Sequence, residues 1–192
     1  LNILDLVVYH KKTSGLQRIK ESKLDYAYKT LHLDMKKISV CFFLSEFLTR
    51  ISQNDDDQKD NFDFIKDSLI VFDRLEVNYS NFHIQFLIKL SKYFGIDIGN
   101  SKHLTGENVK DDINLFVDAC INNSYEVKIK SNNILRNNVI NLIIEHYSRN
   151  LDINMLDLYS LFNRAVNRAK NTWGNPTYTG RFRPARCSVR NK

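Results

Sequence analysis

The stretch NFHIQFLIKLSKYFGI, residues 81–96, is the one from which the fold of this chain can be predicted. Its apolar residues recur every three or four positions, which is the period of an α-helix. Ser80 is a suitable N-cap for this helix, and Gly95 is suited to end it. Polar residues recur at near-helical spacing too, namely His83, Gln85, Lys89 and Lys92. The stretch therefore predicts a helix that is either plain core, or core on one side and a charged flank on the other.

Outward from this helix, the same period predicts four further helices. They are expected over residues 36–51, 62–77, 132–149 and 155–169. The acidic run SQNDDDQKDN between the first two is expected to be a solvated loop, because consecutive carboxylates without a fixed frame seldom bind a metal. Residues 97–108 are expected to form a polar loop. The apolar segment 113–121 is too short for its type to be decided.

The N-terminal residues have a different pattern. Residues 1–9 and 16–21 are rich in Leu, Ile and Val, and a polar turn ending in Gly15 separates them, which is typical of a β-hairpin. Apolar side chains occupy both alternating sets of the first strand, as in a strand of a larger sheet. The predicted fold class is therefore mainly α, with a domain of about five helices preceded by a hairpin.

Charge divides the chain into three parts. Residues 1–37 carry eight Lys or Arg against four acids, residues 38–162 carry twelve against eighteen, and residues 163–192 carry eight against none. A surface that binds phosphates is therefore expected at the ends of the chain, not in its acidic middle.

The last residues differ in composition from the rest. Both prolines, the only Trp and six of the eleven arginines follow residue 162. This segment is either a basic disordered arm or sequence foreign to the rest of the chain. The expected organisation is a hairpin and linker over 1–35, a helical domain over 36–169 and a basic tail over 170–192.

No catalytic or metal-binding motif is found. The chain lacks a Gly-rich phosphate loop, an H-E-x-x-H motif and a G-x-S-x-G motif, so we expect neither an enzyme nor a cofactor. His83 is interpreted as a hydrogen-bonded packing residue. Cys41, Cys120 and Cys187 stand far apart without a C-x-x-C pair, which argues against zinc and for a reducing compartment.

No apolar run approaches the roughly 20 residues that span a bilayer, so no membrane contact is expected.

The most suggestive feature is the basic hairpin. Five cations fall within 13 residues, with Tyr9 nearby as a stacking surface; they are Lys11, Lys12, Arg18, Lys20 and Lys23. Single-strand binders of the OB type combine a positive groove with aromatic platforms in this way. An ordinary solvated hairpin is the alternative.

Three segments resemble RecO, a family of bacterial recombination mediators. They are GLQRIKESK (15–23), ISVCFFLSEFLTRIS (38–52) and NYSNFHIQFLIKLSKYFGI (78–96). IIEHYSRNL followed by LDLYSLF is similar to the closing helices of that family, so the resemblance covers roughly residues 1–166. Most of the N-terminal OB fold is missing, residues 123–132 are shorter than in relatives, and nothing after about residue 169 matches.

The resemblance implies a non-enzymatic, cytoplasmic and nucleoid-associated protein. It implies binding to single- and double-stranded DNA, strand annealing, and action with RecR and the single-strand-binding protein to load the recombinase. The hairpin would be a remnant of the OB fold and would contact DNA. Gln85, Lys89 and Lys92 would meet the acidic C-terminal tail of the single-strand-binding protein. The alternatives are a helical protein-interaction module without a nucleic-acid role, or a truncated, non-functional RecO remnant.

Overall fold

The computed structural model describes residues 1–10, 17–52, 59–105, 111–151 and 154. A two-stranded antiparallel hairpin is followed by helices, so the described chain is mainly α, as predicted. In order, the elements are β1 (Ile3–Tyr9), β2 (Arg18–Tyr26), α1 (Met35–Ile51), α2 (Lys59–Arg74), the 3-10 turn η2 (Tyr79–Asn81), α3 (Phe82–Ser91), the 3-10 turn η3 (Lys92–Phe94), α4 (Lys102–Thr105), α5 (Asp111–Asn122) and α6 (Asn133–Leu151). The predicted helix over 155–169 and the tail over 170–192 lie outside the described residues.

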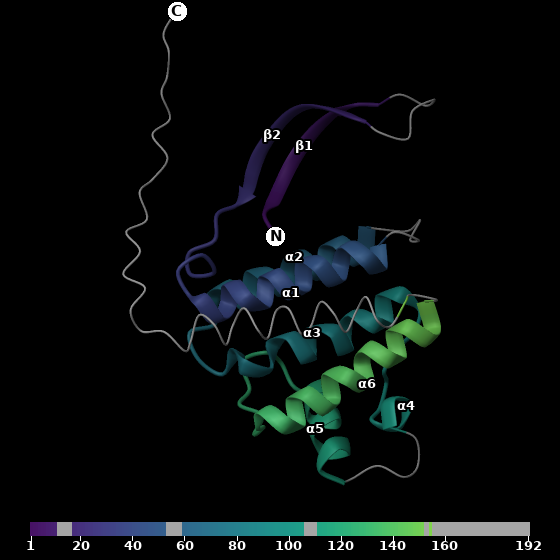
Figure 1. The fold of residues 1–192 in the computed structure, drawn as a ribbon. Coiled ribbons are helices and arrows are strands. Elements are labelled where there is room, and N and C mark those ends of the chain that lie inside the picture. Colours follow the sequence, from purple (N-terminus) through teal and green to yellow (C-terminus); the bar gives the residue numbers. More distant parts are fainter. Residues whose placement is uncertain (11–16, 53–58, 106–110, 152–153, 155–192) are drawn as a thin grey trace, which may run out of the picture.

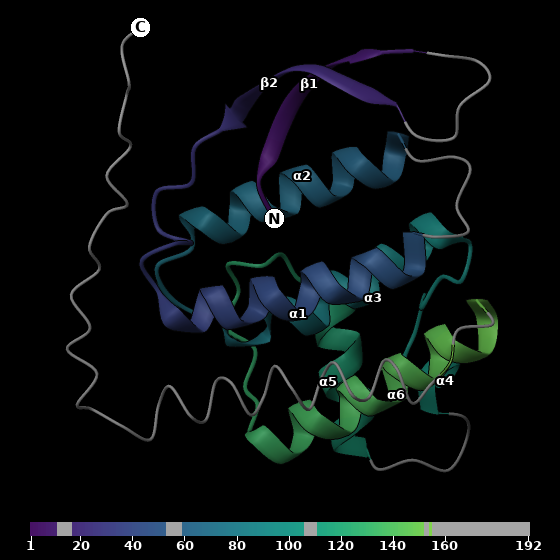
Figure 2. The same cartoon turned by 45° about the horizontal axis from the view of Figure 1, so that its top comes forward.

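Helix α3, the opening stretch, is the centre of the helical part. It lies between the α1–α2 pair and the α5–α6 pair (Figures 1 and 2), and it packs against α2, α5 and α6. Eight of its ten residues are buried, so its apolar surface continues around the helix, as in a core helix. The large apolar residues of the stretch lie in the core: Phe82, Phe86, Leu87 and Leu90 are at most 1% exposed, and Phe94 is partly buried against the core.

Both ends of this helix differ in detail from the prediction. Helix α3 ends at Ser91 and is continued by the 3-10 turn η3, and it is this turn that Gly95 ends, in the left-handed conformation with φ of 69° that favours glycine. Ser80 is not its N-cap, because the turn η2 precedes α3 and Asn81 occupies the cap position. The Asn81 side chain does not cap the helix either. It donates to the carbonyl of Ile129 (2.8 Å) and accepts from the hydroxyl of Ser131 (2.7 Å), so it ties α3 to the segment before α6.

Stacked aromatic rings join the helices. Phe82 of α3 stacks on Phe72 of α2 with ring centroids 3.9 Å apart, and it also meets Tyr125 at 4.7 Å. Phe47 of α1 packs edge-on against Tyr147 of α6, whose buried hydroxyl donates to the carbonyl of Leu87 at 2.8 Å. Four helices are therefore connected through rings at their centre.

The undecided segment 113–121 is helical. Helix α5 buries Ile113, Phe116, Val117 and Cys120, a spacing of three, one and three residues that places them on one face. Among the other predicted helices, α1 and α6 agree with their ranges within two residues at either end. Helix α2 begins three residues earlier than predicted and also ends three residues earlier.

The predicted polar loop over 97–108 contains the short helix α4. The reason is a long-range contact that the local sequence does not reveal. The backbone N–H and the hydroxyl of Ser101 both donate to the carboxylate of Asp118 in α5, at 2.9 and 3.1 Å. This pair fixes the start of α4 against α5.

Within the described ranges, no helix is both long and apolar enough to cross a membrane. The same part of the chain contains no group of three or more His, Cys, Asp or Glu side chains that could hold a metal ion.

Candidate nucleic-acid interface

The hairpin has an irregular register. Strand β2 is longer than the predicted range 16–21, because it pairs with β1 as far as Tyr26, which lies opposite Ile3. Two shifts in the pairing leave one extra residue each on β2, at Lys20 and at Asp25. Such bulges change which side chains share a face of the sheet.

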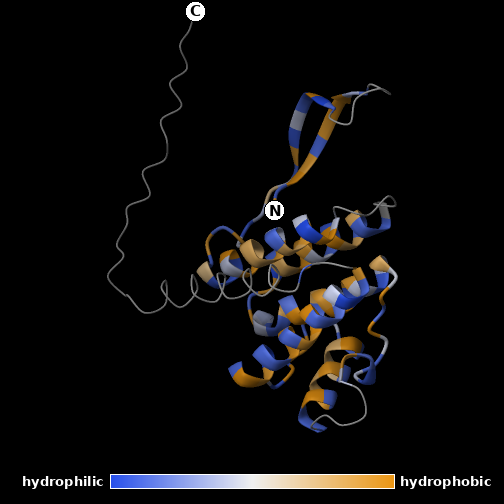
Figure 3. Cartoon of the chain, turned by 45° about the vertical axis from the view of Figure 1, so that its right-hand side comes forward, coloured by the Kyte–Doolittle hydropathy of each residue, from blue (hydrophilic) through white to orange (hydrophobic). Residues whose placement is uncertain are grey.

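The register gives the hairpin one apolar face. Residues directly opposite each other in an antiparallel pair project to the same side. The side that holds the even-numbered residues of β1 is apolar apart from Ser22, and its large side chains are 44 to 56% exposed: Leu4, Leu6, Val8, Ile19 and Leu24. In Figure 3, β1 is coloured mostly as hydrophobic, whereas β2 is mostly hydrophilic with hydrophobic breaks. This apolar face of the hairpin is uncovered, whereas the expectation of a larger sheet rested on apolar side chains on both faces of the first strand.

The other face carries the charges. Tyr9 lies opposite Arg18, and Asp5 lies opposite Lys23, so the predicted stacking ring and two predicted cations share one side. Glu21 is on the same side, between the two cations. Lys20, a bulge residue, lies next to this face, and all three cations are exposed. Of the five predicted DNA-binding residues, Lys11 and Lys12 lie outside the described residues.

Acidic residues accompany these cations. The described part of the hairpin has three cations and three carboxylates, so the local charge is balanced there, which a count of lysines and arginines alone misses. The ion pairs are Lys23 with Asp5 (3.5 Å), Lys20 with Glu21 (3.9 Å) and Lys66 of α2 with Asp25 (2.5 Å). Exposed pairs contribute at most about 1 kcal/mol each, so a phosphate can compete for these lysines. No ion pair is recorded for Arg18 in the described part of the hairpin.

The predicted partner-binding residues on α3 and η3 are placed differently from one another. Gln85 is 1% exposed, and its amide donates to the carbonyls of Asn123 and Ser124 at 3.4 and 3.2 Å. It lies inside the helical part, where a partner peptide cannot reach it. Lys89 is half-buried, and Lys92 is exposed. The predicted flank is therefore reduced at the surface to Lys92 and part of Lys89.

Lys89 has a structural contact of its own. Its ammonium donates to the carbonyl of Asn123 at 2.7 Å and lies 4.9 Å from the centroid of the Tyr125 ring. Burial lowers its pKa. The lysine therefore satisfies a carbonyl near the C-terminus of α5.

Replacing Lys89 by methionine is expected to lower the free energy of unfolding by about 1 to 2 kcal/mol, because it leaves the Asn123 carbonyl without its charged donor. Urea unfolding followed by circular dichroism measures the change. The matched control is Lys92→Met, which removes an exposed ammonium and should change stability by less than about 0.5 kcal/mol. Equal effects of the two substitutions would contradict the structural role of Lys89.

His83 does not have the properties of a catalytic base. Burial, together with the nearby Arg136, lowers its pKa to about 4, so the imidazole is a weaker base than an ordinary histidine. Its ring packs edge-on against Phe43 of α1, with centroids 6.4 Å apart, as expected of a packing residue. The expected hydrogen bond is not found at its buried Nδ1 within the described residues.

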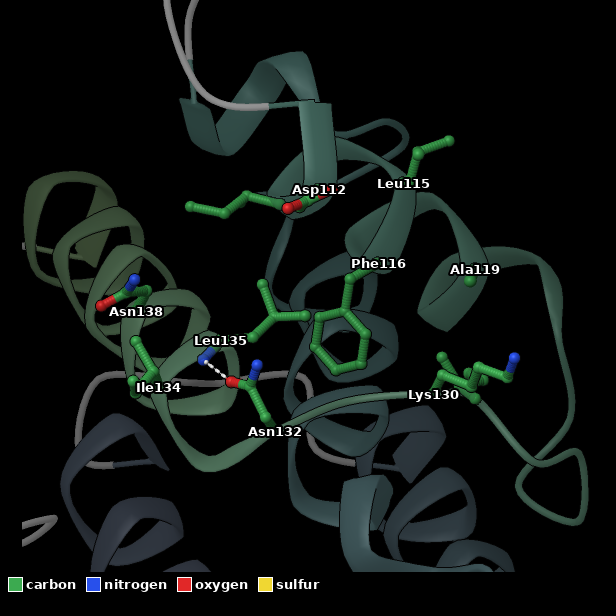
Figure 4. A pocket seen from close by; sticks show the side chains of 11 residues that line it. Asp112, Leu115, Phe116, Ala119, Lys130, Asn132, Ile134, Leu135 and Asn138 are labelled. Carbon is green, nitrogen blue, oxygen red and sulfur yellow. Dashed lines mark hydrogen bonds between the residues drawn. The ribbon is translucent and has the colours of Figure 1, made fainter.

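A groove of about 480 Å³ between α5 and α6 was not predicted from the sequence. Phe116 and Leu135 lie at its floor (Figure 4), and the backbone N–H of Leu135 donates to the side-chain oxygen of Asn132 at 2.8 Å. Among the described residues, Asp112 and Lys130 are the only charged ones that line it. None of the described residues that line it is a Ser, Thr or Cys.

Comparison with curated proteins gives relatives for about half of the chain. A DNA repair protein RecO from Azobacteroides pseudotrichonymphae is 35% identical over 106 residues, which are 55% of this chain and 44% of that protein. RecO proteins from Phocaeicola vulgatus and Flavobacterium johnsoniae are 32% and 33% identical over 96 and 95 residues, each 50% of this chain and 40% of the relative. The matched half of this chain is RecO-like.

The RecO similarity agrees with the resemblance seen in the sequence, and the hairpin fits a remnant of an OB fold. The chain matches less than half the length of these RecO proteins. No protein-family model matches it. No solved structure matches it either.

Proposed function

We propose that this chain acts in DNA repair as a RecO-type recombination mediator without enzymatic activity. In this role it binds and anneals single- and double-stranded DNA. It acts with RecR and the single-strand-binding protein to load the recombinase on single strands. The observation that carries the proposal is the similarity of half the chain to several proteins named DNA repair protein RecO.

The hairpin supports the DNA-binding part of the proposal. Arg18 and Lys23 share an exposed face with Tyr9, which combines phosphate contacts with a ring on which a base can stack. In this proposal Lys11, Lys12 and Lys20 extend the cationic surface. The protein partner, an acidic peptide such as the tail of the single-strand-binding protein, meets Lys92 and the exposed part of Lys89.

Reversing the charge of Lys11, Lys12, Arg18 and Lys20 tests this proposal. Each phosphate contact on a single strand contributes about −0.7 to the slope of log affinity against log salt, so four contacts weaken binding roughly 50-fold between 50 and 200 mM salt. We expect the variant with all four charges reversed to bind more weakly at low salt and to lose most of this slope. Fluorescence anisotropy with a labelled oligonucleotide measures both quantities.

The measurement is made on this chain and on a chimera in which the OB fold of a curated relative precedes it. The control reverses four exposed cations of the helical part, Lys92, Lys102, Lys128 and Lys130, which gives the same change in net charge. A slope that changes equally in both variants would show only a general effect of charge. Binding that does not depend on salt would contradict the hairpin as the phosphate contact.

A further inference from the structure

The segment between β2 and α1 is fixed to α2 by a buried carboxylate. Asp73 of α2 is fully buried, and its side chain accepts hydrogen bonds from three consecutive backbone N–H groups, those of Lys29, Thr30 and Leu31, at 2.8 to 3.1 Å. The hydroxyl of Tyr26, the last residue of β2, donates to the same carboxylate at 3.1 Å. All of these donors lie at the end of β2 or in the segment that follows it.

A buried lysine of α1 adds to this contact between the linker (residues 27–34) and α2, which is called the joint below. Lys37 is 2% exposed, and its ammonium donates to the backbone carbonyl of Asp73 at 3.0 Å and to the hydroxyl of Thr30 at 2.7 Å. The Thr30 hydroxyl in turn donates to the Asp73 carbonyl. The same ammonium lies 5.6 Å from the Phe72 ring centroid and 5.3 Å from that of Tyr79. The linker is thus held between α1 and α2.

The electrostatics favour the closed joint. Burial raises the pKa of Asp73, but the three backbone N–H donors and the Tyr26 hydroxyl outweigh burial and lower the pKa to about 2. The carboxylate is therefore ionised and fully hydrogen-bonded at neutral pH. Moving the linker away would break these hydrogen bonds together, and only water could replace them.

The rest of the hairpin has few contacts that could orient it. Ile3 is the only buried residue in either strand, and the other large apolar side chains of β1 and β2 are exposed. The exposed pair between Asp25 and Lys66 is a second tie to α2, but such pairs are weak. The orientation of the hairpin therefore depends mainly on the joint at its base.

We infer that Asp73 is a positioning residue that holds the hairpin and the helical part as one rigid body, so that the cationic face of the hairpin points in a single direction. The rigid orientation stands on the geometry of the joint alone. Only its use, the presentation of phosphate-binding residues, rests on the proposed function. The segment 27–34 is therefore a fixed joint and not a flexible linker.

Residual dipolar couplings of the ¹⁵N-labelled chain test the inference without DNA. In the unmodified chain, one alignment tensor should fit the couplings of the hairpin and of the helices. Asp73→Asn keeps the shape of the side chain but brings an N–H₂ group against the N–H donors, and we expect it to require two tensors while the couplings within the helices are retained. Asp63→Asn, an exposed aspartate of the same helix, should keep a single tensor.

A single tensor in Asp73→Asn would overturn the inference. If that variant does not fold, amide hydrogen exchange in the unmodified chain decides. The N–H groups of residues 29–31 should exchange as slowly as those of α2, and exchange as fast as in exposed loops would contradict a fixed joint. Neither measurement involves DNA, so failure of DNA binding and failure of the joint are distinguishable.

Discussion

Replacing Phe82 by alanine is expected to lower the free energy of unfolding by about 3 to 5 kcal/mol, the usual cost of removing a fully buried aromatic side chain. The ring is 1% exposed and lies between Phe72 of α2 and Tyr125. Its loss leaves a cavity where α2, α3 and the segment after α5 meet. Urea unfolding followed by circular dichroism gives the change as a shift of the midpoint at constant slope.

The control for this prediction is Leu115→Ala on α5. Leu115 is also a large apolar residue, but it is 69% exposed, so we expect a change within about 0.5 kcal/mol. A Phe82→Ala variant that loses less than about 1 kcal/mol would show that the stacked rings do not form the centre of the core.

The second large effect concerns acid and Asp73. Its pKa in the folded chain is about 2, below the ordinary 3.8, so the folded state binds this proton less readily than the unfolded state does. The resulting stabilisation is fully present above about pH 4 and is lost as the pH falls through 2. The difference between the two pKa values corresponds to roughly 2 kcal/mol.

Comparing the unmodified chain with Asp73→Asn isolates this contribution, because the other carboxyl groups are common to both. The free energy of unfolding of the unmodified chain should exceed that of the variant at pH 6, and the difference should shrink by roughly 2 kcal/mol as the pH falls to 2. Asp63→Asn should show no such convergence. Parallel pH profiles for the unmodified chain and Asp73→Asn would rule out an ionised Asp73 as the source of stability.

The helices could be predicted because their apolar residues have a clear period. The period of 3.6 residues in 81–96 predicted helix α3. In the structure this helix is buried on nearly all sides. Details set by long-range contacts could not be predicted in this way. Ser80 has the local chemistry of a cap, but the turn η2 precedes the helix and Asn81 bonds across to Ile129. Helix α4 similarly depends on Asp118, 17 residues away from Ser101.

The candidate site was predicted less completely than the fold. Its cations were found by counting along the chain, whereas their ion pairs depend on a register with two bulges that sequence patterns do not specify. Gln85 and Lys89 look like a polar flank in sequence, but the carbonyls that bind them come from the far end of α5. Asp73 was missed, although a signal was present. A single carboxylate within the apolar run LIVFDRL, residues 69–75, is a candidate for a buried, fully bonded charge.

The buried position of Lys37 also affects its reactivity as an amine. Reagents that acylate lysines need a free, deprotonated and accessible nitrogen, and this ammonium has its protons directed at two oxygens and its exposed fraction reduced to 2%. Lys29, at the surface of the same joint, has no such protection of its side chain. The rate at which Lys37 is acylated relative to Lys29 therefore depends on how often the joint opens. Measuring that rate would report the frequency of opening.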